Sequence, residues 1–226
     1  MTVPDLGPLW LTLRRAAIVT LILIALATPL AWWLSRSRSA LRPVVEALTA
    51  LPLVLPPTVL GFYLLLLLNP EAPIGRFWLS FTGDTLTFSF AGLVVASVLY
   101  SLPFAVQPLQ TAFAAVGRAP MEAAAACGAP PLDAFLTVAL PLARRGYLTA
   151  AVLTFAHTIG EFGVVLMVGG NIPGETKLIS IAIYEHVERI DYAAAHILSA
   201  LLLGFSFLVL LGLYWVNRPA HAEAAP

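Results

Sequence analysis

A helix-forming segment with a fixed pattern of small residues stands between two long apolar stretches. It begins with Glu122-Ala123-Ala124, continues after three further residues with Gly128, and ends after another nine with Val138-Ala139-Leu140-Pro141. Alanine favours a short helix over 122–127, and glycine is the usual residue just past a helix end. Ala129-Pro130-Pro131 then forces a turn before a second short helix over 132–138. We call this protruding pair of short helices the knob. Its residues are suited to docking a partner protein rather than to catalysis.

Glu161 is the second candidate, because it is an ionisable residue inside an apolar stretch. A buried charge of this kind is costly and needs either a partner or a water-filled cavity. We predict that Glu161 is structural and bonds amides or hydroxyls of a neighbouring helix; a role in a pathway or gate is the alternative. His157, four residues earlier, lies on the same helical face and can reach it. Asn171, in the turn-forming sequence Asn171-Ile172-Pro173-Gly174, is a further structural or gate candidate.

Several kinds of catalytic site are missing from the sequence. The closest approach to a phosphate-binding loop runs from Gly169 to Gly174, but Glu175-Thr176 follows where Lys and Ser or Thr are needed. Any ATP hydrolysis must therefore come from another chain. The histidines are not at metal-ligand spacing, and Cys127 stands alone, so we expect no metal and no cofactor. An intramembrane hydrolase remains the rival class, and ATP-independent activity would favour it.

The composition indicates a membrane protein. Of the 226 residues, 60% are hydrophobic and 11% are charged, against about 25% charged in a typical soluble domain. The mean hydropathy is +0.90. The formal net charge is zero, which argues against nucleic acid as a partner. We expect one transmembrane domain over 1–226 in a lipid bilayer.

The elements that position these residues are apolar segments of about 20 residues, the length that crosses a bilayer. About five segments qualify: 16–34, 47–68, 88–107, 147–168 and 193–216. The expected fold is an all-α integral membrane protein with about five transmembrane helices. Glu161 is the only Asp, Glu, Lys or Arg that we place inside a span. Residues 4–13 have apolar side chains at helical spacing and are expected to lie along the interface, and the tail 217–226 is expected to be disordered.

Orientation follows from the positive charges of the loops. With five spans, the knob, the 35–46 loop and the C-terminal tail share one side, which holds Arg36, Arg38, Arg42, Arg118, Arg144, Arg145 and Arg218. The other side holds Arg14, Arg15, Arg76, Lys177 and Arg189. This bias predicts an outer N-terminus and a cytoplasmic knob and C-terminus.

Prolines interrupt the second apolar segment near its middle, at Pro56-Pro57-Thr58. A broken span points to a substrate pathway, since interrupted backbone at membrane depth must line protein or a cavity. The alternative is a kink that serves packing only. We predict a pathway lined by Pro56, Pro57, Thr58 and Thr158 that offers hydroxyls and amides and no Lys or Arg.

The knob over 118–141 resembles the coupling loop of bacterial ABC importer permeases, in which Val138 replaces the usual Ile. Beyond it, residues 11–214 resemble the permease subunit of molybdate importers. That resemblance rests on 51–63, on Gly160-Glu161-Phe162-Gly163, and on 170–174 with 181–184. Gly-Glu-Phe-Gly is shared with sulfate permeases, and Ile179-Ser180 departs from the family pattern.

The resemblance implies a type I ABC importer permease in the bacterial inner membrane. It implies a permease homodimer with two copies of a cytoplasmic ABC ATPase and an external substrate-binding protein, importing molybdate or tungstate by alternating access. Glu122, Ala123, Ala124, Gly128, Leu140 and Pro141 would dock the ATPase. A sulfate or thiosulfate permease and another ABC importer permease are the alternatives.

Overall fold

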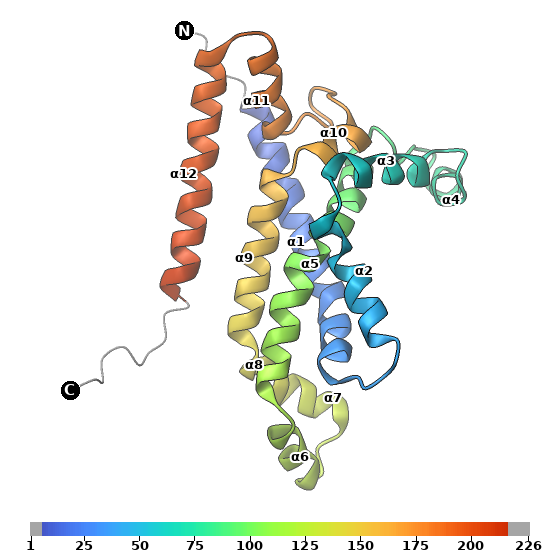
Figure 1. Ribbon diagram of the computed structural model, residues 1–226, viewed down its shortest axis with the longest axis vertical. Coiled ribbons are helices and arrows are strands. Elements are labelled where there is room, and N and C mark those ends of the chain that lie inside the picture. Colours follow the sequence, from blue (N-terminus) through green and yellow to red (C-terminus); the bar gives the residue numbers. More distant parts are fainter. Residues whose placement is uncertain (1–5, 217–226) are drawn as a thin grey trace, which may run out of the picture.

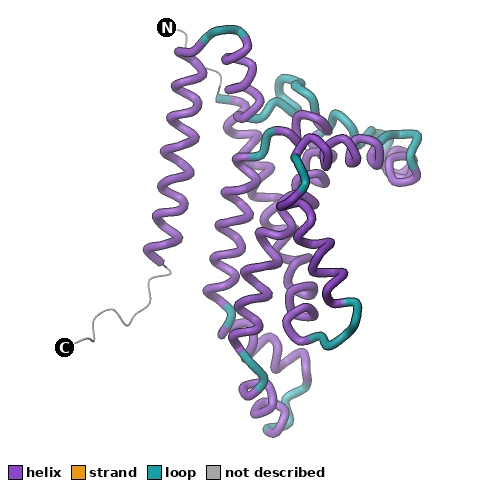
Figure 2. The backbone as a smooth tube through the Cα atoms, viewed as in Figure 1, coloured by secondary structure: helices purple, strands orange, loops and turns teal. Residues whose placement is uncertain are grey.

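The computed structural model describes residues 6–216, and these form helices and loops without a strand (Figures 1 and 2). The long helices are α1 (Gly7–Arg36), α5 (Phe90–Val116), α9 (Arg144–Gly160) and α12 (Tyr192–Val216). The shorter ones are α2 (Arg42–Val54), α3 (Pro57–Leu68), α4 (Pro73–Thr82), α6 (Ala119–Ala126), α7 (Pro131–Ala134), α8 (Leu140–Leu142), α10 (Gly163–Gly169) and α11 (Ile179–Glu188).

The core is formed where α1, α5 and α9 pack lengthwise against one another. One buried cluster contains Val19, Leu23 and Ala27 of α1, Leu109 of α5 and Ala150 of α9. Small residues let the backbones approach, as is usual between helices in membranes, where lipid removes the hydrophobic drive for association. The other helices are arranged around this three-helix body (Figure 1).

Three helices are long and apolar enough to cross a membrane, namely α1, α5 and α12. Two bent pairs, α2 with α3 and α9 with α10, bring the number to as many as five. The predicted break in the second span is confirmed, with a bend of 113° at Leu55-Pro56. The 63° break between α9 and α10, at Glu161-Phe162, was not predicted.

The start of the first span differs from the prediction. The helix α1 begins at Gly7, before the apolar window that starts at residue 16, and runs without interruption to Arg36. Residues 7–13 are therefore part of the first long helix rather than a separate lead-in, and Arg14 and Arg15 lie within it. Residues 4 and 5 of that lead-in and the tail 217–226 lie outside the described residues.

The second halves of the two broken spans pack against each other through glycines. A Cβ added at Gly61 of α3 would lie 2.9 Å from Cβ of Met167 in α10. One added at Gly163 of α10 would lie 2.9 Å from Cβ of Pro57 in α3. Both distances are shorter than a real Cβ contact, so only glycine permits this approach. The two breaks consequently lie side by side.

The knob projects from one end of the molecule (Figure 1). Gly128 has φ of +83°, the left-handed conformation that the sequence predicts after the first short helix. The second short helix differs from expectation, because α7 continues into a π-helical turn over Phe135–Ala139. The ring of Trp32 in α1 packs edge-to-face with the rings of Phe113 and Phe135, at centroid distances of 5.2 and 4.9 Å, respectively. The contact with Phe135 anchors the knob to the spans.

Candidate functional site

Glu161 lies at the break between α9 and α10, and its carboxylate is fully buried against Arg15 of α1. The Arg15 Nη1 and Glu161 Oε2 atoms are 3.1 Å apart. Ser97 donates to Oε2 and Ser101 donates to Oε1, each at 2.6 Å. Arg15 also donates to the carbonyl oxygen of Thr158 through Nη2. The pair thus joins α1, α5 and the end of α9 at one point.

This environment confirms one prediction for Glu161 and corrects another. The expected hydroxyl donors from a neighbouring helix are present as Ser97 and Ser101 of α5. The expectation that no Lys or Arg lies within the spans is wrong, because Arg15 is inside α1 and fully buried. The apolar window of the first span was started at residue 16, directly after Arg15, and so the prediction could not place Arg15 beside Glu161.

His157 joins the same network through Ser101. Its Nδ1 atom lies 2.9 Å from Ser101 Oγ and 3.7 Å from Glu161 Oε1. When Ser101 donates its single hydroxyl proton to Glu161, a hydrogen bond between Ser101 and His157 requires the proton on Nδ1. The imidazole ring stacks on Phe104, with centroids 3.8 Å apart, and contacts Tyr100.

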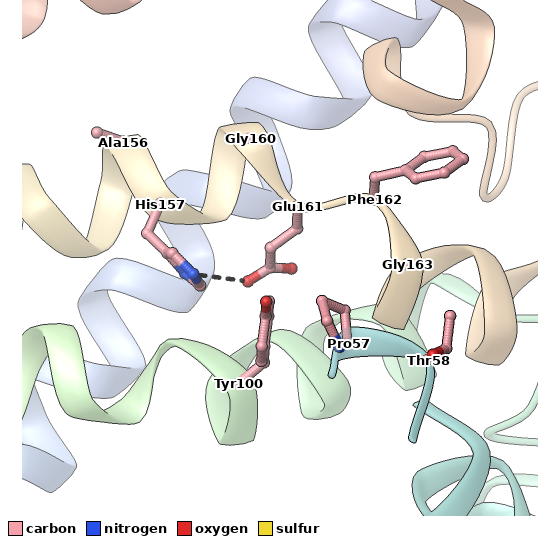
Figure 3. Close-up of a pocket in the computed structure, with 9 residues that line it drawn as sticks. All are labelled: Pro57, Thr58, Tyr100, Ala156, His157, Gly160, Glu161, Phe162 and Gly163. Atoms are coloured by element: carbon pink, nitrogen blue, oxygen red, sulfur yellow. Dashed lines mark ion pairs between the residues drawn. The ribbon is translucent and has the colours of Figure 1, made fainter. Parts of the chain in front are cut away.

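A cavity of about 510 Å³ opens where the two broken spans meet. Figure 3 shows its lining: Pro57, Thr58, Tyr100, Ala156, His157, Gly160, Glu161, Phe162 and Gly163. Of the predicted pathway residues, Pro57 and Thr58 lie in this lining, and Pro56 precedes them at the break. Thr158 is not among the lining residues; its side chain is fully buried and its hydroxyl donates to the Thr154 carbonyl at 2.8 Å.

The helix α3 begins at this cavity with Pro57, so the N-terminal end of a twelve-residue helix lies at the break. The N-terminal end of a helix carries a partial positive charge. The buried pair of Arg15 and Glu161 has no net charge, and the wall behind the cavity is therefore close to neutral. This combination can accept an anion without holding it strongly.

Asn171 belongs to a separate polar cluster at the other end of the molecule from the knob. Its Nδ2 atom donates to Glu185 Oε2 at 3.3 Å. Glu185 also pairs with Lys177 and Arg189, and the hydrogen bond from Lys177 holds the pKa of Glu185 below its ordinary value. This cluster ties the loop after α10 to α11.

The knob residues are mostly accessible to a partner. None of the side chains of α6, which contains Glu122, Ala123 and Ala124, is buried. Leu132 and Leu136 expose 70% and 51% of their surface, an apolar patch that another protein can cover. Pro141 is exposed and Leu140 half-buried where the knob joins α9. Among the described residues, no group of three or more His, Cys, Asp or Glu side chains is placed to hold a metal ion.

Comparison with known proteins agrees with this architecture. Residues 14–219 match the family described as binding-protein-dependent transport system inner membrane component. The chain is 56% identical to the molybdenum transport system permease protein ModB of Azotobacter vinelandii, over 95% of each chain. It is 34% identical to the sulfate transport system permease protein CysT of a Synechocystis species, over 82% of this chain and 65% of that one.

A solved bacterial alginate ABC transporter in complex with a periplasmic protein has the same fold. Its matching chain aligns with a TM-score of 0.74 at 15% identity, over 94% of this chain and 78% of the other. The broken spans, the knob and these matches agree, and the chain belongs to the family of inner membrane components of binding-protein-dependent transport systems.

Proposed function

We propose that this chain is the permease subunit of an ATP-driven importer of molybdate, with tungstate as an alternative substrate of the same shape and charge. The observation that carries the proposal is the 56% identity to a molybdenum permease over 95% of both chains. The relative from a sulfate system is less similar, and the share of its length that aligns is smaller. Sulfate or thiosulfate is therefore the second candidate substrate.

The energy for transport is proposed to come from a separate ATPase that docks on the knob. The sequence lacks a phosphate-binding loop, and the exposed α6 with Leu132 and Leu136 offers a surface for a soluble partner. We propose two permease copies, two ATPase copies and an external substrate-binding protein. Glu122, Ala123, Ala124 and Gly128 form the docking surface, and Leu140 and Pro141 connect it to α9.

We further propose that the knob lies in the cytoplasm and that α1 starts on the outer side. The arginine bias of the loops supports this orientation. The start of α1 lies at the end opposite the knob, and α12 runs from that end toward the knob (Figure 1). Such an arrangement suits an odd number of spans, with the C-terminal tail on the cytoplasmic side.

The cavity at the two breaks is proposed as part of the translocation pathway. Pro56, Pro57 and Thr58 supply a helix N-terminus and a hydroxyl, and the neutral pair behind them avoids a strong cationic trap. Conduction requires a site that binds weakly enough to release its ion. Alternating access would move α3 and α10, which are packed together through Gly61 and Gly163, relative to the three-helix body.

The substrate is tested by uptake in bacterial cells that lack their own molybdate permease. Cells that express this chain with its ATPase and binding protein should accumulate molybdate, and tungstate should compete while equimolar sulfate should not. Uptake of labelled sulfate that molybdate does not reduce would contradict the molybdate assignment and favour the sulfate alternative.

A further inference from the structure

Two hollows lie along the same pair of helices. The first is the cavity at the breaks, to which α5 contributes Tyr100 and α9 contributes His157. The second, of about 580 Å³, lies nearer the knob, and Gln107, Thr111, Arg145 and Thr149 are among its lining residues. Each hollow is open on one side.

The two hollows share one face of each helix. On α9, Arg145, Thr149, Leu153 and His157 follow at four-residue intervals. On α5, Tyr100, Phe104, Gln107 and Thr111 follow at intervals of four, three and four. Residues at these intervals lie on one side of a helix. The two hollows therefore lie along one stripe of side chains on α5 and α9, and we call the one at the breaks the outer cavity and the one near Arg145 the inner hollow.

Between the two hollows, the side chains along this stripe are apolar. Phe104, which stacks on His157, and Leu153 separate the two hollows with apolar surface. At the inner hollow, α5 and α9 approach each other closely, since a Cβ added at Gly146 would lie 2.2 Å from Ala112 Cβ.

The inner hollow has a different charge from the outer one. Its lining contains Arg145 and no carboxylate, whereas Glu161 contributes to the outer lining. The Arg145 side chain is exposed, and within residues 6–216 it forms no ion pair with a carboxylate. The hydroxyls of Thr111 and Thr149 donate to carbonyls of their own helices, which leaves Arg145 and the Gln107 amide as donors toward the hollow.

We propose that this inner hollow is a second binding site for the permeating tetrahedral dianion, at the exit of the route, with Arg145 and Gln107 as its ligands. The proposal rests on the oxyanion transport proposed above. A guanidinium and an amide are suitable donors to an oxyanion, and exposure to water keeps the site weak enough to release it. Phe104 separates this exit site from the cavity at the breaks.

The test uses inside-out membrane vesicles that contain the full chain with its ATPase, so that the knob side faces the medium. Cys127, the only cysteine, is replaced by Cys127→Ser, and Thr111→Cys places a reporter thiol in the wall of the hollow. Molybdate should slow alkylation of this thiol severalfold. Arg145→Gln should weaken the apparent affinity for molybdate about tenfold, the loss expected for one charge-assisted hydrogen bond.

Arg144→Gln is the matched control, because Arg144 is also exposed but does not line the hollow, and it should keep the parent affinity. If Thr111→Cys prevents assembly, Ala115→Cys in the same lining takes its place. Absence of protection, or equal protection in Arg145→Gln, overturns the proposal. Protection that depends on anionic lipid and not on molybdate also overturns it and assigns Arg145 to a lipid phosphate. If cells that express the parent still take up molybdate, the proposed function stands and only the second binding site is wrong.

Discussion

Arg15 and Glu161, 146 residues apart in the sequence, form a fully buried ion pair that ties the first long helix to the break in the fourth span. Ser97 and Ser101 complete the hydrogen bonds of the carboxylate. Removing one partner of a buried pair leaves an uncompensated charge, which is more costly than losing the attraction itself. The pair therefore holds α1 against the break between α9 and α10, next to the cavity. We call this buried pair the clamp.

Glu161→Gln is expected to destabilise the protein, even though glutamine keeps the shape of the side chain. The buried Arg15 loses its counter-charge, at a cost of about 3–5 kcal/mol. The double variant Arg15→Met with Glu161→Gln should recover a large part of this loss. Thermal unfolding of the detergent-purified single and double variants measures the coupling. Additive effects of the two substitutions, or a Glu161→Gln variant as stable as the parent, would rule out the clamp.

Gly128→Val is expected to abolish the response of ATP hydrolysis to loaded binding protein while the permease still inserts. Gly128 has φ of +83°, a conformation that is strained for a β-branched residue. Gly128→Asn is the control, since asparagine adopts left-handed backbone more readily and should retain most of the stimulation. Normal stimulated hydrolysis in Gly128→Val would show that the hinge geometry does not matter.

The cluster around Glu185 is expected to make the stability of the loop after α10 depend on pH in the acid range. Because the folded-state pKa of Glu185 is lowered, its contribution to stability is complete above the unfolded value of about 4.3 and is lost as pH falls through the folded value. The parent should therefore hold this loop more tightly than Glu185→Gln near neutral pH. Limited proteolysis of both proteins should show the difference disappearing in acid. A difference that is constant with pH would exclude this electrostatic origin.

The sequence was sufficient for the parts of the fold that depend on local chemistry. The break at Leu55-Pro56 was visible because consecutive prolines cannot continue a helix, and the left-handed turn was visible because Gly128 follows an alanine-rich helix. The partner of Glu161 was missed, because pairing of residues far apart in sequence leaves no local signal. The break at Glu161-Phe162 had only its flanking Gly160 and Gly163 as a sign, and glycine is common in membrane helices.

The lining of the cavity at the two breaks was predicted in part for the same reason. Thr58 follows the proline break and lines the cavity, whereas Thr158 was chosen for its hydroxyl alone. Which face of α9 turns toward α5 depends on packing of three helices, and this packing buries Thr158 and presents His157. The π-helical turn over Phe135–Ala139 and the contact of Phe135 with Trp32 were likewise not visible in the composition.

The most direct test of the account is molybdate uptake into proteoliposomes that contain the purified permease with its ATPase, supplied outside with loaded binding protein and inside with ATP. The account predicts uptake that requires all three proteins, ceases without ATP hydrolysis, and is lost in Gly128→Val but kept in Gly128→Asn. Molybdate uptake without ATP, or ATP-driven uptake that is unchanged in Gly128→Val, would contradict the claim that this chain couples an ATPase on its knob to oxyanion import.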